Sequence, residues 1–138
     1  MPEEPELPNR AVHLLISEDF FLGKVDAAAR ALERGPVVPD WDQPILEQIA
    51  QRPHAEMVMD LELDRLKVSD LLRELRQDPR TREMAILGYC SHNLTQLITQ
   101  AQGLGVQVVA RSTFAANLVR LMQELFRPAS GAGEEPEE

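Results

Sequence analysis

Two acidic residues stand where this sequence is best placed to do chemistry. Asp60 directly follows the apolar run at 57–59, and Glu18 closely follows a second apolar run at 12–16. If both runs are strands of an open parallel sheet, the two carboxylates lie at the carboxyl ends of the strands, where such folds bind ligands. Carboxylate oxygens suit Mg²⁺, which binds one or two acids together with water and phosphate oxygens. A turn or helix-cap role for Asp60 is the alternative, because acids are also common at those positions.

The elements that would position these acids follow from the hydrophobic pattern. Short apolar runs predict strands, and they alternate with segments that have apolar residues at helical spacing. The predicted strands are residues 12–16, 37–38, 57–60, 84–89 and 106–110, and the predicted helices are residues 21–34, 45–51, 66–76, 94–101 and 114–126. This alternation implies a parallel five-stranded sheet with helices on both faces. In the strand order 2-1-3-4-5, strands one and three are neighbours, which would bring Glu18 and Asp60 into one crevice.

Composition favours a single soluble globular domain. The chain has 138 residues, 43% hydrophobic and 27% charged, and no apolar run near the roughly 18 residues that cross a bilayer. A single cysteine, Cys90, suits a reducing compartment, so we expect a cytoplasmic location and no membrane contact. Residues 1–10 and 128–138 hold three and four glutamates and are predicted to be acidic disordered tails around a domain at 11–127. No basic stripe with interleaved aromatics exists, so nucleic-acid binding is not expected.

One stretch of the sequence resembles a known family. The segment LLRELRQDPRTR at 71–82 is similar to the third helix and following loop of response-regulator receiver domains of bacterial two-component signalling, and the layout of residues 11–126 resembles the flavodoxin-like three-layer sandwich of that family. The resemblance implies that Asp60 holds the phosphoacceptor position. It also implies that Glu18, Asp60 and the backbone carbonyl of Glu62 would bind Mg²⁺.

Other positions depart from the family pattern. Ser17 replaces one acid of the pair after strand one, Cys90 stands where a Thr or Ser is usual, and Ser112 stands where a Lys is usual. Arg111 is the nearest substitute cation, yet strict strand alternation would point it away from the side of residue 112. The aromatic switch position of the family falls on Val109. A thiol is a weak donor and phosphoryl transfer needs positioned positive charge, so phosphorylation is predicted to be weak or absent.

A surface between the fourth and last predicted helices is a candidate interface. Residues 93–110 contain no charged residue, and the last helix carries a second apolar stripe. In receiver domains this face is the usual partner surface, which implies a protein partner or a homodimer; a wide but ordinary core face is the alternative. The predicted interface residues are Leu94, Leu97, Val119, Met122 and Phe126.

The expected function is that of a divergent, pseudo-receiver-like signalling domain that is not an enzyme and acts through protein association. The alternative is a functional Mg²⁺-dependent phosphoacceptor that a histidine kinase phosphorylates at Asp60. A third hypothesis is a small-molecule-binding domain that uses the same crevice without phosphate. The cofactor expected is Mg²⁺, weakly held. Cys90 is expected to be a small buried residue rather than a redox sensor, and the histidines share no metal-ligand spacing.

Overall fold

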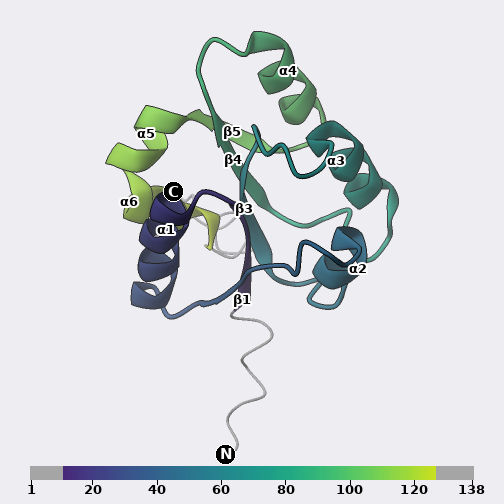
Figure 1. Cartoon of the computed structure of the whole chain (residues 1–138), viewed down its shortest axis with the longest axis horizontal. Coiled ribbons are helices and arrows are strands. Elements are labelled where there is room, and N and C mark those ends of the chain that lie inside the picture. Colours follow the sequence, from purple (N-terminus) through teal and green to yellow (C-terminus); the bar gives the residue numbers. More distant parts are fainter. Residues whose placement is uncertain (1–10, 127–138) are drawn as a thin grey trace, which may run out of the picture.

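The sheet has five parallel strands in the order predicted from the sequence (Figure 1). The structure, a computed structural model, describes residues 11–126, so the predicted tails at 1–10 and 128–138 and residue 127 lie outside the described residues. The strands are β1 (Ala11–Leu15), β2 (Gly35–Val37), β3 (Glu56–Asp60), β4 (Ile86–Cys90) and β5 (Gln107–Ala110). They lie in the order β2-β1-β3-β4-β5, and every neighbouring pair is parallel, which confirms the flavodoxin-like α/β sandwich.

The helices largely match the predicted ones, except at the end of the described chain. They are α1 (Asp19–Ala31), α2 (Ile45–Ala50), α3 (Val68–Gln77), α4 (Thr95–Gly103), α5 (Arg111–Ala116) and α6 (Leu118–Leu125). The prediction of one helix at 114–126 is wrong, because α5 and α6 are separated at Asn117, where φ is −128° and ψ is 33°. The Asn117 side-chain amide donates to the Thr113 carbonyl oxygen at 3.0 Å. Such local side-chain bonds compete with the helical pattern and favour a break.

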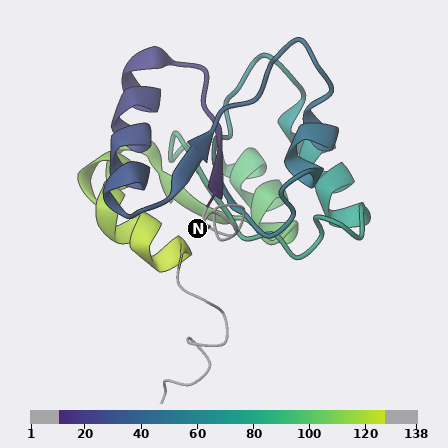
Figure 2. The same cartoon turned by 90° about the horizontal axis from the view of Figure 1, so that it is seen from below.

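The helices form one layer on each face of the sheet (Figure 2). α1, α5 and α6 pack on one face, where Val25 and Phe114 are buried, and α2, α3 and α4 pack on the other, where Leu72 and Ala101 are buried. β1 and β4 are buried along their whole length, and β3 nearly so, which is why these strands read as continuous apolar runs. Within residues 11–126, no helix is long and apolar enough to cross a bilayer.

A glycine in β4 makes room for the residue that follows Asp60. Gly88 is buried and pairs with Met59 of β3, and a Cβ added to it would lie 2.8 Å from the Leu61 Cγ atom. Leu61 is itself 2% exposed, and its backbone N–H donates to the Tyr89 carbonyl oxygen at 2.9 Å. Because Gly88 has no side chain, the Leu61 side chain can pack into the core next to the end of β3.

An arginine of α3 holds two loops at the amino ends of the strands, the end of the sheet opposite Asp60. The Arg76 guanidinium donates from Nε to the Leu104 carbonyl oxygen at 2.7 Å and from Nη1 to the Met84 carbonyl oxygen at 2.8 Å. It also donates to the carbonyl oxygens of Arg82 and Gly105, at 3.0 and 3.4 Å. One side chain thus satisfies carbonyl groups of the loops that lead into β4 and β5.

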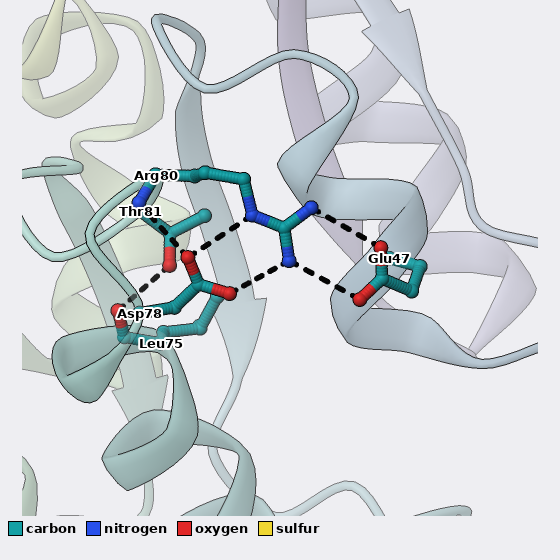
Figure 3. Close-up of polar contacts among 5 residues, drawn as sticks. All are labelled: Glu47, Leu75, Asp78, Arg80 and Thr81. Carbon is teal, nitrogen blue, oxygen red and sulfur yellow. Dashed lines mark hydrogen bonds and ion pairs between the residues drawn. The ribbon is translucent and has the colours of Figure 1, made fainter.

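A second arginine, Arg80, joins α2 to the loop after α3 (Figure 3). Its guanidinium makes two bonds to the Glu47 carboxylate, at 3.2 and 3.1 Å, and two to the Asp78 carboxylate, at 3.0 and 2.7 Å. Beside it, the buried Thr81 hydroxyl donates to the Leu75 carbonyl oxygen at 2.7 Å. The polar residues of the segment at 71–82 therefore stabilise a loop at the edge of the sheet opposite Asp60.

We expect Gly88→Ala to lower the free energy of unfolding by about 1–3 kcal/mol, because the new methyl group overpacks the Leu61 side chain. Gly23→Ala is the matched control: Gly23 is exposed within α1, a Cβ there meets nothing within 4 Å, and the change should add roughly 0.5–1 kcal/mol. Urea unfolding measures both. Similar effects from the two substitutions would mean that Leu61 moves aside freely.

Arg76→Lys should lower the free energy of unfolding by about 1–3 kcal/mol, because an ammonium group cannot reach all the carbonyl groups that the planar guanidinium serves. Arg73→Lys, on the exposed side of the same helix, is the control and should change it by less than about 0.5 kcal/mol. Thermal and urea unfolding report the difference. An Arg76→Lys variant as stable as the control would contradict a structural role for these bonds.

Candidate functional site

The candidate site lies at the carboxyl ends of the central strands, as predicted. Asp60 is the last residue of β3 and pairs in register with Tyr89 of β4. A cleft of about 620 Å³ opens at this edge of the sheet, and its lining includes Glu18, Phe21 and Arg111. Asp60 is not part of the cleft lining; it reaches the cleft through its contact with Arg111.

Asp60 is a largely buried acid with a fixed orientation. Its side chain is 11% exposed, and its Oδ1 atom accepts a hydrogen bond from the Glu62 backbone N–H at 2.8 Å. Burial raises the pKa of the Asp60 carboxyl, and the nearby charges of Glu62 and Glu18 raise it further, against the opposing effects of that hydrogen bond and of Arg111. The ionised acid is therefore held in place at a cost in free energy.

Arg111 is the cation of this site, and its predicted direction is wrong. β5 ends at Ala110 and Arg111 begins α5, so strand alternation does not apply to it. Its Nη2 atom lies 3.8 Å from Asp60 Oδ1 and 3.0 Å from Glu62 Oε2, and its guanidinium lies 5.4 Å from the centre of the Tyr89 ring. A positive charge thus stands beside Asp60 even though Ser112 occupies the expected lysine position.

Glu62 takes part through its side chain as well as its backbone. The family resemblance implied only its backbone carbonyl, as a metal ligand. In the structure, the Glu62 carboxylate accepts hydrogen bonds from the Ser91 backbone N–H at 2.8 Å and from Arg111 at 3.0 Å. These bonds join residues that lie 29 and 49 positions apart, so no local pattern could have indicated them.

An aromatic cluster that the sequence did not indicate lies beneath the cleft. The Tyr89 ring stacks on Phe114, with centroids 4.8 Å apart, and meets the edge of Phe21 at 4.9 Å. The Tyr89 hydroxyl is buried and has no hydrogen-bond partner among residues 11–126, and burial raises its pKa. Phe21 is the member of this cluster that lines the cleft, and Tyr89 joins the cluster to Arg111.

Glu18 has a structural role in addition to any ligand binding. Glu18 is the N-cap of α1, and its Oε1 atom accepts the Phe21 backbone N–H at 2.9 Å. Ser17 is half-buried. Glu18 and Asp60 are close enough for their charges to interact, and paired carboxylates suit Mg²⁺. Within the described residues, no three histidine, cysteine or acidic side chains form a group that could hold a metal ion.

The remaining predicted phosphate positions differ in access. Cys90 is 0% exposed and packs in the core between the sheet and the α2, α3 and α4 layer, and burial raises the pKa of its thiol. Ser112 is exposed and lines the cleft. Val109 is partly buried in the opposite core cluster. The thiol is therefore a buried side chain, whereas Ser112 offers a hydroxyl to the cleft.

The five predicted interface residues do not form one exposed stripe. Met122 is 0% exposed in the core, so its assignment to the surface is wrong: the turn of α6 that carries it faces the sheet. Leu94 and Leu97 are half-buried against the other core cluster. Phe126 is half-buried under the Arg34 guanidinium, 4.3 Å from its ring centre, and Val119 is 48% exposed. Of the predicted apolar surface, Val119 is the exposed member.

The overall geometry matches that of solved receiver domains. No protein-family model and no curated protein sequence matches the chain. The receiver domain of a sensor histidine kinase from Pseudomonas aeruginosa, solved with magnesium in its active-site cleft, is 18% identical, with a TM-score of 0.70 over 85% of this chain and 97% of that domain. A sensor protein from a Polaromonas species is 22% identical, with a TM-score of 0.68 over 84% and 94% of the two chains.

A chemotaxis response regulator of Vibrio cholerae shows how little sequence the shared architecture requires. It is 9% identical to this chain, with a TM-score of 0.70 over 83% of this chain and 97% of its own. Likeness at such identities concerns the arrangement of strands and helices. The strand order, the two helical layers and these structural neighbours show that the chain has the fold of response-regulator receiver domains.

Proposed function

We propose that the chain is a divergent receiver-like signalling domain, not an enzyme, that works in the cytoplasm by protein association, with phosphorylation of Asp60 weak or absent. The observation that carries the proposal is the ion pair between Arg111 and Glu62. The guanidinium lies 3.0 Å from the Glu62 carboxylate and 3.8 Å from Asp60. A phosphoryl group on Asp60 would need that positive charge on its own oxygens.

The acidity of the site supports weak phosphorylation. The charges of Glu62 and Glu18 act on Asp60, and in the described part of the chain Arg111 is the cation that contacts Asp60 and Glu62. Adding the negative charge of a phosphoryl group to such a cluster is unfavourable unless a divalent cation is also bound. The residues that would hold Mg²⁺ are Glu18, Asp60 and the Glu62 backbone carbonyl. Because Glu18 also caps α1, we propose that they hold the ion weakly.

The outer surface of α4 supports association with a protein. The residues of α4 that point to solvent are neutral and polar, and they continue onto exposed Gln107 at the start of β5. β5 is one of the two edge strands of the sheet, and no strand within residues 11–126 pairs with its outer edge. The exposed residues of α4 are Thr95, Gln96, Thr99, Gln100, Gln102 and Gly103. We propose that a protein partner or a second copy binds across this face, together with Val119 on α6.

A working phosphoacceptor is the second candidate function. It is favoured by the position of Asp60 at the end of β3 and by the cleft that opens beside it. In this case a histidine kinase would be a partner and Mg²⁺ a required cofactor. The two candidates differ in whether a phosphoryl mimic changes the protein.

Exposure to Mg²⁺ and beryllofluoride separates the two candidates. We expect the oligomeric state, measured by size-exclusion chromatography with light scattering, to be the same with and without the mimic. We also expect no mass increment after incubation with a small-molecule phosphodonor. A phosphate increment that Asp60→Asn abolishes, or association that appears only with the mimic, would establish the working phosphoacceptor instead.

Asp60→Asn should stabilise the fold at neutral pH. The native pKa of Asp60 is raised above its unfolded value of about 3.9 by burial, so the folded state disfavours the ionised acid. The stability cost is present above the raised pKa and disappears as the pH falls below the unfolded value. Asn keeps an oxygen that can accept the Glu62 N–H. The advantage of Asp60→Asn should therefore shrink as the pH is lowered towards 4.

Urea unfolding at neutral and acidic pH measures this effect. Asp64→Asn, which removes the same charge from an exposed position in the same loop, is the control and should change stability little at either pH. If Asp60→Asn destabilises the protein at neutral pH, the favourable contact between Asp60 and Arg111 outweighs the cost of burying the carboxylate. The ionised acid would then stabilise the fold.

A further inference from the structure

The Glu62 carboxylate occupies the point at which two hydrogen-bond donors of the protein converge. The Ser91 backbone N–H and the Arg111 guanidinium both donate to the same atom, Glu62 Oε2, at 2.8 and 3.0 Å. A backbone amide and a guanidinium directed at one point are the donor types that proteins use for phosphate and related oxyanions. The donors come from the loop after β4 and from the first residue of α5, so the bound oxygen connects two separate segments of the chain.

The same contacts place this oxygen next to Asp60. The Glu62 backbone N–H donates to Asp60 Oδ1 at 2.8 Å, and Arg111 Nη2 is shared between the two acids. An aspartate that accepts the N–H two residues ahead fixes the local turn. Asp60 therefore sets the course of the chain that carries the Glu62 carboxylate to its donors.

We propose that the Glu62 carboxylate is an internal anionic ligand of the Ser91 N–H and the Arg111 guanidinium, a pair of donors that we call the seat. A tetrahedral oxyanion binds to the seat only when the Glu62 side chain is displaced. This inference deepens the proposed function, on which it rests, by giving weak phosphorylation a specific cause. The shared chemistry is that of a phosphate oxygen, either free in solution or part of a phosphoryl group on Asp60.

The residues around Glu62 keep its carboxylate ionised but leave its side chain free to move into solvent. The Ser91 N–H and Arg111 hold the pKa of the Glu62 carboxyl below its usual value, so Glu62 is ionised at neutral pH. Its side chain is 31% exposed, so it can turn into solvent without opening the core. Tyr89 lies beneath the guanidinium, with its ring centre 5.4 Å away, and supports Arg111 once Glu62 has gone.

Displacement changes the charge balance of the seat in favour of an oxyanion. With Glu62 in place, an incoming phosphate meets Glu62, Asp60 and Glu18 and finds both donors occupied. Removing Glu62 frees the two donors and takes away one of the three negative charges. Charge alone would give a similar gain for any nearby acid, whereas freed donors are specific to Glu62.

Titration with inorganic phosphate, followed through the amide resonance of Ser91, tests the seat in the full chain. We expect Glu62→Ala to bind phosphate roughly tenfold or more tightly than the wild type, since a tenfold change corresponds to about one favourable hydrogen bond to a charged group. Asp64→Ala removes an exposed acid from the same loop and controls for charge; it should gain much less. Adding Arg111→Ala to Glu62→Ala should abolish the gain.

A second arm with Mg²⁺ and beryllofluoride distinguishes the source of the oxyanion. A response of Glu62→Ala to phosphate alone assigns the seat to a free oxyanion, and a response to beryllofluoride that Asp60→Asn removes assigns it to a phosphoryl group. Either supports the seat. Equal gains for Glu62→Ala and Asp64→Ala, or a gain that survives loss of Arg111, would overturn it. Association measured by light scattering is a separate readout. The proposed function can therefore fail while the seat is confirmed, and the seat can fail while the proposed function is confirmed.

Discussion

The register of β3 between β1 and β4 determines where every group of the candidate site lies. β3 is hydrogen-bonded on both edges and covered on both faces, so a shift of one residue would move Met57 and Met59 into the core that now holds Val58, and Val58 into theirs. In the observed register Asp60 stands beside Tyr89, and Leu61 packs into the space left by Gly88. The packing of apolar residues therefore places the acid at the end of the strand.

Charge at this edge of the sheet is organised around a shared cation. Arg111 contacts Glu62 and Asp60 and lies over the Tyr89 ring. Because Glu62 also accepts the Ser91 N–H, the loop after β3, the loop after β4 and the first residue of α5 meet at one carboxylate. In this state the loops are already connected by the protein's own groups. Under the proposed function, these contacts keep the surface that a partner would meet unchanged until the carboxylate moves.

The surfaces available for association follow from the two-layer packing. α4 turns its neutral polar side towards solvent next to the edge strand β5, whereas α6 turns Met122 into the core and leaves Val119 outside. The break at Asn117 sets the direction of α6, because it ends α5 before the second apolar stripe begins. An apolar stripe in a sequence identifies a helix face, and the direction of the helix decides whether that face is surface or core.

Local patterns in the sequence were sufficient for the architecture and for the place of Asp60. Strands buried on both faces produce apolar runs, helices produce a 3.6-residue period, and an acid at the end of a run marks the carboxyl edge, so each feature is encoded by near neighbours. The roles of Glu62, Arg111 and Tyr89, and the burial of Met122, could not be obtained in this way. They depend on side chains that meet across 29 or 49 residues of chain and on the exact end of β5, and only the packed sheet and its helices bring those groups together.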